Sequence, residues 1–447
     1  MSFSSRLALL LSPMLSVYGA HAQTSPMSVA LLPPTPASYK AIGQQTDENL
    51  RAHVLSQWFP RAIAKDLGGG FDQNFSENWA NTSKGERSVV YQARLTWLAS
   101  QAALRYAPEA ERWKQYASHG ASFLRDHMWD SQYGGFFWQL QSGKPAREGE
   151  KHAYGIAFAI YALAAHFQAT GDARSLDMAQ KAFRWLESHA HDPKNGGYYE
   201  ALTQQGKPII IAPSTEQPTD VIGTRYGYKS MNTHIHLLEA FAALSEEWKD
   251  KTLRSRLSEV FHLVRDTVVV APPGAMHLYF RPDWKAIPGH DSYGHDIETA
   301  YLLVEASTVL GHPDDEQTWN VARALVDHTL EVALDSQNGG IYNEGDTFGA
   351  ISDADKVWWV QAEALNALLL MHHKYGRAMP RYWEAFQRQW AFIQGRQIDR
   401  KNGGWFGHVS KEGQATPGAS KSSGWTEGYH QGRALLNVSK LLKEMST

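Results

Sequence analysis

Three histidines of this chain stand beside polar residues at helical spacing. Asn232 and His236 are four residues apart, and His295 and Glu298 are three apart, so each pair shares one face of a helix. A third segment ends at His430. Histidine titrates near neutral pH, and a carboxylate beside an imidazole fixes its tautomer and raises its basicity. These residue types predict acid–base chemistry, in which protons move between a substrate and the imidazoles.

Aromatic side chains accompany the histidines. The chain has 16 Trp among 447 residues, and such rings either fill a large core or stack against flat ligands such as sugar rings. Trp358, Trp359 and Glu363 open another helical segment, and Trp425 precedes His430 by five residues. We expect these residues to bring stacking rings and one acid to the site.

Two further polar residues lie in segments that are otherwise apolar. Arg94 and Tyr154 would be buried there, and a buried polar group needs a hydrogen-bonding partner. A bound sugar would supply that partner, and so would another side chain of the protein.

A zinc site is the alternative use of the histidines. His234 and His236, with His295 and Glu298, carry suitable ligand atoms. Two imidazoles at i and i+2 of a helix point apart, however, and the chain has no HExxH-like pair. We therefore expect no metal at this site and interpret His234 as a structural residue.

Two other classes of protein remain open. A glycoside hydrolase needs paired carboxylates across a cleft, for which Glu298 and Glu363 are candidates, although the excess of histidine argues against it. A sugar-binding protein without turnover is the other. The glycine pairs lack the GxGxxG and GxxxxGK spacings, so no dinucleotide or phosphate-binding loop is expected, and we predict no cofactor.

A sequence repeat predicts the helices and turns that must position these residues. Two glycines followed by aromatic or apolar residues start at Gly69, Gly134, Gly196, Gly339 and Gly403. The starts are 65, 62, 143 and 64 residues apart, and Pro272–Met276 lies near the middle of the long interval as a degenerate copy. Six units of about 65 residues are implied.

An apolar helix and an amphipathic helix alternate between the glycine pairs. Tyr154–Phe167 is apolar nearly all round, whereas Leu176–His189 has one apolar face. The alternation recurs at Thr233–Leu244 with Leu253–Val264, and at Val357–His372 with Tyr382–Ile393.

Six such pairs predict an all-α (α/α)6 barrel with short β-hairpins in its loops. An open helical solenoid is the alternative, but the inner helices are apolar on too many faces to leave one side in water. No linker interrupts residues 41–447, so we expect one domain.

The N-terminal 22 residues have the pattern of a secretory signal. Arg6 is positively charged, Leu7–Val17 is apolar, and Ala20–Ala22 fits the small-x-small rule, which predicts cleavage before Gln23. We expect an exported protein, periplasmic or secreted.

The composition and charge of the chain argue against nucleic-acid partners and a membrane anchor. Residues 23–40 are rich in Pro, Ser and Thr and predict a flexible leader, and the chain has no cysteine. The count of 43 basic against 46 acidic residues gives a net charge of −3, so a nucleic-acid partner is not expected.

The apolar run near the N-terminus is broken by Pro13 and is shorter than the ~20 residues that span a bilayer. No membrane association is therefore expected after the signal is removed.

Several strings, taken together, resemble the N-acylglucosamine 2-epimerase family and most closely its cellobiose 2-epimerase branch. The strings are KSMNTHIHLLEAF, GHDIE, KVWWVQAEAL and WTEGYHQGR, with YQAR and KHAYGIAFAIYAL upstream. They span nearly the whole chain after the leader, and as a set they are specific. The resemblance implies the same (α/α)6 barrel.

The resemblance also implies roles for single residues. His295 and His430 match the pair that moves the C2 proton of a sugar, and His236 matches a third functional histidine. Glu298 matches the acid beside His295, and Arg94 matches the arginine that steadies the substrate oxygens. The residues that match the substrate pocket are Tyr154, Asn232, Trp358, Trp425 and Trp284, the last as the ring that stacks on the distal sugar.

The expected reaction is inversion at C2 of the reducing-end glucose or mannose of a β-1,4-linked disaccharide, through an enediolate. Two imidazoles on opposite sides of C2, each titrating near neutrality, suit this task. The expected partner is a small sugar, and the expected assembly is a monomer or weak homodimer. N-acylglucosamine epimerisation and aldose–ketose isomerisation of mannose are the alternatives within the enzyme class.

Overall fold

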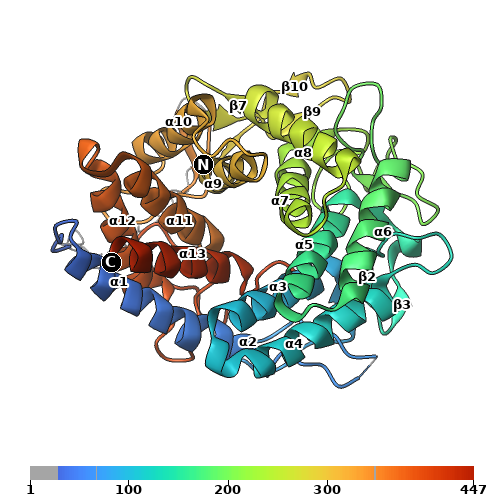
Figure 1. Ribbon diagram of the computed structural model, residues 1–447, viewed down its shortest axis with the longest axis horizontal. Coiled ribbons are helices and arrows are strands. Elements are labelled where there is room, and N and C mark those ends of the chain that lie inside the picture. Colours follow the sequence, from blue (N-terminus) through green and yellow to red (C-terminus); the bar gives the residue numbers. More distant parts are fainter. Residues whose placement is uncertain (1–28, 67, 347–348) are drawn as a thin grey trace, which may run out of the picture.

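The computed structural model describes residues 29–66, 68–346 and 349–447, so the signal segment 1–22 and residues 23–28 lie outside the described part. The helices form two concentric rings around a central axis (Figure 1). The inner helices are α3 (Val89–Arg105), α5 (Ala153–Thr170), α7 (Met231–Glu247), α9 (Tyr293–Val309), α11 (Trp358–Tyr375) and α13 (Tyr429–Met445). The outer helices are α1 (Pro36–Asn49), α4 (Ala110–Phe123), α6 (Ala173–His189), α8 (Lys251–Leu263), α10 (Glu316–Val332) and α12 (Arg381–Phe392).

Shorter helical segments extend these elements. One is the single turn α2 (Ser56–Trp58). Four π-helical turns follow outer helices, at Leu50–Leu55, Leu124–Met128, Val264–Val268 and Ile393–Gln397, and three 3₁₀ turns lie at Ala107–Glu109, Arg147–Gly149 and Gly376–Ala378.

The ring is closed. Each inner helix contacts the next one along the chain, and α13 contacts α3, which rules out the open solenoid. The predicted (α/α)6 barrel is confirmed, and each pair of helices predicted from the apolar pattern is present within a few residues of its expected bounds.

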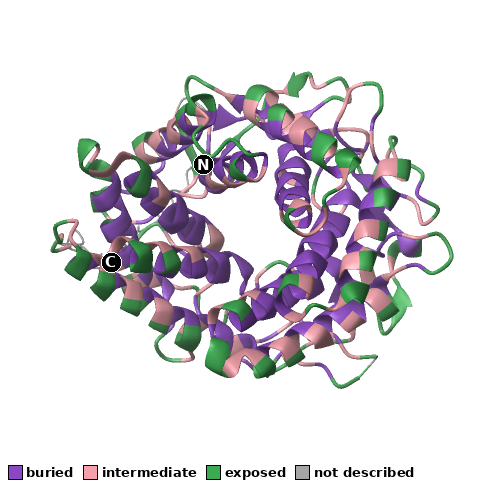
Figure 2. Ribbon diagram, in the orientation of Figure 1, coloured by how far each residue is buried: buried purple, intermediate pink, exposed green. Residues whose placement is uncertain are grey.

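Burial follows the same two rings. The inner helix α5 is buried along nearly its whole length, whereas α6 buries one face that includes Ala182, Phe183 and Leu186. Figure 2 shows the inner helices almost entirely buried and the outer helices exposed on their outward faces. The apolar core therefore fills the space between the rings, where each outer helix covers the inner helix of its unit.

Short antiparallel strands lie at the ends of the helices. They are β1 (Glu86–Ser88), β2 (Gln139–Gln141), β3 (Lys144–Pro145), β4 (Lys151–His152), β5 (Ala201–Leu202), β6 (Lys229–Ser230), β7 (Val269–Val270), β8 (Ala275–Met276), β9 (Tyr279–Phe280), β10 (Ala286–Ile287), β11 (Asp291–Ser292), β12 (Glu344–Gly345), β13 (Ile351–Asp353), β14 (Lys356–Val357) and β15 (His408–Val409). Their sheets have the orders β1-β2-β3, β10-β9-β6, β11-β12-β13, β14-β15, β4-β5 and β7-β8. Because β1, β4, β6, β11 and β14 each run directly into an inner helix, they fix where that helix begins.

The glycine pairs make the turns between outer and inner helices. Gly134 and Gly135 have φ values of 69° and 75°, a left-handed conformation that glycine adopts without a steric penalty. Residues seven apart form a bridge across four of these turns, as in Trp129 with Phe136, and Ile63 bridges Phe71 across the turn at Gly69. The degenerate copy at Pro272–Met276 is built in the same way, since Val269 pairs with Met276 in the β7-β8 hairpin.

The first helix begins inside the segment that composition assigned to a flexible leader. Helix α1 starts at Pro36, so residues 36–40 are helical rather than loose. The reason is local: Thr35 accepts a hydrogen bond from the backbone N–H of Ser38, and proline is favoured in the first helical turn. Leu32 is also anchored, because its carbonyl accepts a hydrogen bond of 2.8 Å from the indole of Trp383.

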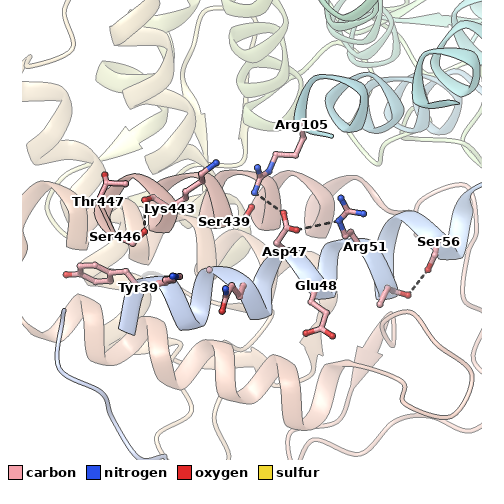
Figure 3. Close-up of a pocket in the computed structure, with 14 residues that line it drawn as sticks. Tyr39, Asp47, Glu48, Arg51, Ser56, Arg105, Ser439, Lys443, Ser446 and Thr447 are labelled. Carbon is pink, nitrogen blue, oxygen red and sulfur yellow. Dashed lines mark hydrogen bonds and ion pairs between the residues drawn. The ribbon is translucent and has the colours of Figure 1, made fainter. Parts of the chain in front are cut away.

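Helix α1 completes the outer ring by packing on α13. A cavity of about 800 Å³ lies between these helices and is crossed by ion pairs from Asp47 to Arg105 and Arg51 (Figure 3). None of the candidate histidines lines it. Among the described residues, no helix is both long and apolar enough to cross a membrane.

Candidate active site

The three candidate histidines lie in the first two turns of three inner helices. His236 belongs to α7, His295 to α9 and His430 to α13. His236 and His430 are buried, and His295 is partly buried. The strand–helix junctions β6–α7 and β11–α9 hold the first two at one end of the inner ring.

Two of these imidazoles are held by carboxylates. Nδ1 of His236 lies 3.0 Å from Oε2 of Glu239, and Nδ1 of His430 lies 2.8 Å from Oε1 of Glu363. A carboxylate only accepts hydrogen bonds, so Nδ1 carries the proton in both rings and Nε2 keeps a lone pair. Neither Nε2 atom has a hydrogen-bond partner in the described part of the chain, which leaves both atoms available to a substrate.

The third imidazole, that of His295, contacts a hydroxyl group. It also packs against the same indole ring as His430. Nδ1 of His295 lies 2.7 Å from Oγ of Ser292. The indole of Trp359 lies with its centroid 4.7 Å from that of His295 and 5.5 Å from that of His430. The structure therefore brings His295 and His430 against one indole ring, as a shared site requires.

Glu298 forms no hydrogen bond with His295 in the described chain, although its charge acts on that imidazole. Its Oε1 atom accepts a hydrogen bond from Arg433 and lies 3.9 Å from Nδ1 of His430. The buried guanidinium of Arg433 attracts the carboxylate, and Ser292 takes the position next to His295.

A buried arginine joins the two carboxylate–imidazole pairs. Arg433 on α13 donates hydrogen bonds to Glu239, Glu298 and Glu363, and the side chains of all four are 1% exposed or less. Burial would raise the pKa of Glu239, but Arg433 and hydrogen bonds outweigh it and hold that pKa at about 2. The chain of contacts His236–Glu239–Arg433–Glu363–His430 thus fixes both imidazoles through one cation.

Arg94 forms hydrogen bonds with two side chains of the protein itself. Its guanidinium donates to Glu427 at 2.6 Å and to the hydroxyl of Tyr154 at 3.1 Å. The ring of Tyr154 lies 5.2 Å from that of His236, which connects Arg94 to the histidine cluster. Nε of Arg94 is buried without a partner, so part of its hydrogen-bonding capacity remains unused.

Of the other expected pocket residues, Trp425 is exposed, whereas Asn232 and Trp358 have buried polar atoms. Trp425 is 45% exposed and lies 6.1 Å from the ring of Tyr154, at the edge of a cavity of about 230 Å³. Oδ1 of Asn232 and Nε1 of Trp358 are buried with no partner among the described residues, so both can hydrogen-bond a ligand.

Trp284 packs beside the turn that contains Gly196. Its indole N–H donates to the carbonyl of Gly196 at 3.2 Å, and its ring packs 4.8 Å from His234 and over Lys229. The β9-β10 hairpin, which carries Trp284 at its turn, thus holds the ring against the Gly196 loop. His234 is a structural residue here, as expected, because its two ring nitrogens bond Ser230 and Tyr198.

Sequence reasoning assigned no role to several residues that the structure places in the site. They are Arg433, Glu239, Glu427 and Tyr429. The spacing did carry a signal for two of them: His236 and Glu239 are three apart on one helix, as His295 and Glu298 are, and Arg433 follows His430 by three.

The pKa of each member of the histidine pair is lowered. Burial lowers the pKa of His295 to about 4, and burial together with Arg94 lowers the pKa of His430 well below its usual value. This differs from the expectation that both imidazoles titrate near neutrality. Both rings are therefore neutral at pH 7 in the free protein, which suits removal of a proton from a substrate.

The pH dependence of turnover follows from His430. The charged and titratable side chains that face it come from five inner helices: Arg94, His236, Glu298, Glu363 and Arg433. Because the pKa of His430 is lowered, its neutral form persists below pH ~6.5, the ordinary midpoint of histidine. We expect the acid limb of kcat/KM, measured from about pH 4 to pH 9, to fall below that midpoint. An acid limb centred above it would contradict this account.

Comparisons with known proteins agree with this site and fold. The profile of the N-acylglucosamine 2-epimerase (GlcNAc 2-epimerase) family matches residues 69–434. A cellobiose 2-epimerase of Bacteroides fragilis is 30% identical over 398 residues, which cover 88% of this chain and 98% of that protein. A D-mannose isomerase of Marinomonas mediterranea is 25% identical, with 91% of this chain and 99% of that protein covered.

A solved structure extends the likeness to three dimensions. The cellobiose 2-epimerase from Spirochaeta thermophila matches with a TM-score of 0.81 and 32% identity, over 91% of this chain and 98% of its own. Together with the family profile, these likenesses establish a sugar epimerase or isomerase. The chain therefore belongs to the N-acylglucosamine 2-epimerase family.

Proposed function

We propose that this enzyme inverts C2 of the reducing-end glucose or mannose unit of a β-1,4-linked disaccharide. The observation that carries the proposal is the arrangement of the imidazoles. His295 and His430 flank Trp359, each has its Nδ1 atom anchored, and each leaves its Nε2 atom without a partner in the described residues. The similarity to two cellobiose 2-epimerases supports the choice of a disaccharide.

The reaction begins with the open-chain sugar, since the hydrogen on C2 is acidic only beside a free aldehyde. One imidazole removes this proton through Nε2, the electron pair of the C2–H bond forms a double bond between C1 and C2, and the π electrons of the aldehyde move to its oxygen to give an enediolate. The other imidazole takes up a solvent proton on Nε2 beside the negative enediolate and delivers it to the opposite face of C2, which re-forms the aldehyde. The first imidazole then releases its extra proton to solvent, so both rings return to the neutral state. No electrons leave the sugar, so the step balances without a redox partner.

The surrounding groups support the charge that develops on oxygen. We assign the unpaired Nε–H of Arg94 as the donor to the sugar oxygen that carries the developing charge. The lone pair on Nε2 of His236 and the amide oxygen of Asn232 can accept hydrogen bonds from sugar hydroxyls. Glu363 holds the tautomer of His430, and Glu298 raises the basicity of His295 through its nearby charge. Trp358, Trp359 and Trp425 supply faces for the sugar rings.

Aldose–ketose isomerisation is the second candidate, because the same enediolate gives a ketose if the proton returns to C1. The similarity to a D-mannose isomerase favours it. N-acylglucosamine epimerisation would use the same proton transfer.

Product analysis separates these reactions. We expect incubation with cellobiose to yield glucosyl-mannose, detected by chromatography against standards. Free glucose would indicate hydrolysis, a keto-disaccharide would indicate isomerisation, and binding without any product would indicate a lectin-like protein; each of these results would overturn the proposal. Mannobiose, lactose, mannose and N-acetylglucosamine, tested in parallel, define the substrate range.

We also propose that the protein is exported, with Gln23 as the first residue of the mature chain, and that it acts as a monomer or weak homodimer. The N-terminal pattern around Arg6 and Ala20–Ala22 supports export. Sequencing the N-terminus of the protein recovered from the periplasm or medium tests it, and recovery of the chain only from the cytoplasm with Met1 retained would contradict it.

A further inference from the structure

A buried ion pair recurs at the junction between the glycine turns and the inner helices. An aspartate lies two or three residues beyond the end of the outer helix or of its π-helical turn, and it pairs with a lysine that precedes the next inner helix. The pairs are Asp130–Lys151 at 2.9 Å, Asp192–Lys229 at 2.8 Å, Asp335–Lys356 at 2.7 Å and Asp399–Lys421 at 2.6 Å. All four lysine side chains are completely buried, so each ammonium is the cation that its junction requires.

The unit that carries α9 lacks both members of this pair. In the four units that contain the pair, the aspartate directly follows the first residue of the bridge across the glycine turn, and the equivalent of Trp129 in the β7-β8 hairpin is Val269. The unit that carries α3 instead pairs Arg87 with Asp72. The aspartate is therefore replaced by Val270. The lysine position, which directly precedes the N-cap residue of α5 and α7, is occupied here by Asp291 before the N-cap Ser292. A buried carboxylate thus stands where other units have an ammonium.

Asp291 gathers a second carboxylate and an imidazole. Its Oδ2 lies 3.0 Å from Nε2 of His328 on α10, and ligand atoms of Asp291, Asp296 and His328 all lie within 4.8 Å of one another. Asp291 and Asp296 are 0% exposed, and His328 is 4% exposed. By ordinary hydrogen-bond geometry, both oxygens of Asp296 and Oδ1 of Asp291 have no partner in the described chain, and the nearest polar groups to Asp296 are the carboxyl of Asp291 and the backbone N–H of Met276. Neither aspartate is paired with a lysine or arginine there.

Each of the two other such groups in the described chain has a partner that the cluster at Asp291 lacks, although Oε2 of Glu298 and Oε2 of Glu363 are also buried without a hydrogen bond. In the group His152, Glu200 and Asp220, the carboxylates accept hydrogen bonds from Ser230 and from backbone N–H groups. The group Glu298, Glu363 and His430 contains Arg433 as its cation. Only the cluster at Asp291 combines buried, unpartnered carboxylate oxygens with the loss of the repeat's own cation.

We propose that Asp291, Asp296 and His328 bind one divalent metal ion, which takes the structural place of the lysine ammonium in this unit. Two carboxylates neutralise the double positive charge, and a neutral imidazole completes a nitrogen–oxygen ligand set that suits Zn²⁺ or Mn²⁺. Because the ligands come from the start of α9, from α9 itself and from α10, the ion joins an inner helix to its outer partner. Its role is to stabilise this unit and is independent of the proton transfer at C2.

Metal content is the first test. We expect the protein purified after growth with Zn²⁺ and Mn²⁺ to contain about one divalent ion per chain by elemental mass spectrometry. Removing the ion with a chelator should lower Tm by about 3 °C relative to protein held at a free ion concentration 100-fold above Kd. A proton on Asp296, whose pKa burial raises well above its usual range, is the competing occupant. Protein that holds no ion, even after incubation with either metal, would establish the proton and overturn the proposal.

Variants locate the ion and separate its loss from misfolding. Asp296→Asn and His328→Ala should each lower the metal content at least tenfold, whereas Asp220→Asn, in the satisfied cluster, should leave it unchanged. The double variant Val270→Asp with Asp291→Lys rebuilds the ion pair of the other units, and it should contain no ion while its Tm becomes insensitive to the chelator. Retention of the ion by both single variants, or an ion lost equally from Asp220→Asn, would overturn the assignment.

Discussion

Replacing His430 with alanine is expected to lower kcat by ~10²-fold or more, while the protein stays folded. The variant removes the Nε2 lone pair that takes or returns the C2 proton. Its fold should survive, because Glu363 keeps its hydrogen bond of 2.6 Å to Arg433 when the imidazole is gone. The measurement is the initial rate with the disaccharide that gives the highest turnover, together with circular dichroism of the variant.

A matched control is available on another inner helix. His373 on α11 is exposed, and His373→Ala should keep the wild-type kcat. Normal turnover by His430→Ala would show that this imidazole does not carry the proton. An equal loss in both variants would show that the effect of His430 is not specific to the site.

Replacing Arg433 with methionine is expected to destabilise the fold by about 3–5 kcal/mol. The substitution keeps a similar length but removes the one cation that contacts Glu239, Glu298 and Glu363, all of which are buried. Three carboxylates would then lack compensation in a region closed to water. The measurement is the free energy of unfolding from urea denaturation.

An exposed ion pair provides the comparison. Lys181 and Asp177 lie 2.8 Å apart on the surface of α6, and Lys181→Ala should cost less than about 1 kcal/mol. If Arg433→Met is too unstable to purify, Arg433→Lys keeps the charge without the planar fork and should give a smaller loss. A free energy of unfolding for Arg433→Met equal to that of the wild type would contradict the role of this arginine.

The barrel could be predicted from sequence because its signals are local and repeated. The glycine pairs mark each reversal of the chain, and a helix as apolar as Tyr154–Phe167 can only lie between other helices. Residues 36–40 were assigned to the flexible leader because composition outweighed a specific signal, the cap Thr35 followed by Pro36.

The site was predicted in part. The three histidines carried their own signal, since each opens an inner helix in a polar segment, and the structure places each in those turns. Their partners depend on contacts between helices that are distant along the chain. Glu239 meets Arg433 across 194 residues, and His430 meets Glu363 across 67. Spacing on a single helix cannot show which of several acids a buried arginine will attract, which is why Glu298 was expected beside His295.

The surroundings of Trp284 also come from parts of the chain that are distant in sequence. Its ring is held by the Gly196 carbonyl and by Lys229, which belong to a different turn and a different strand. A tryptophan in a hairpin carries no sequence signal that separates a sugar platform from packing against a neighbouring loop.

The most direct test of the central claim is the isotope at C2 when the reaction is run in heavy water. If His295 and His430 exchange a proton with solvent across one enediolate, the product should carry one deuterium at C2 and none at any other carbon, as read by proton NMR and mass spectrometry. His430→Ala should slow this incorporation as much as it slows turnover. An epimer formed without deuterium at C2, or label that appears at C1 in a ketose, would contradict the proposed transfer.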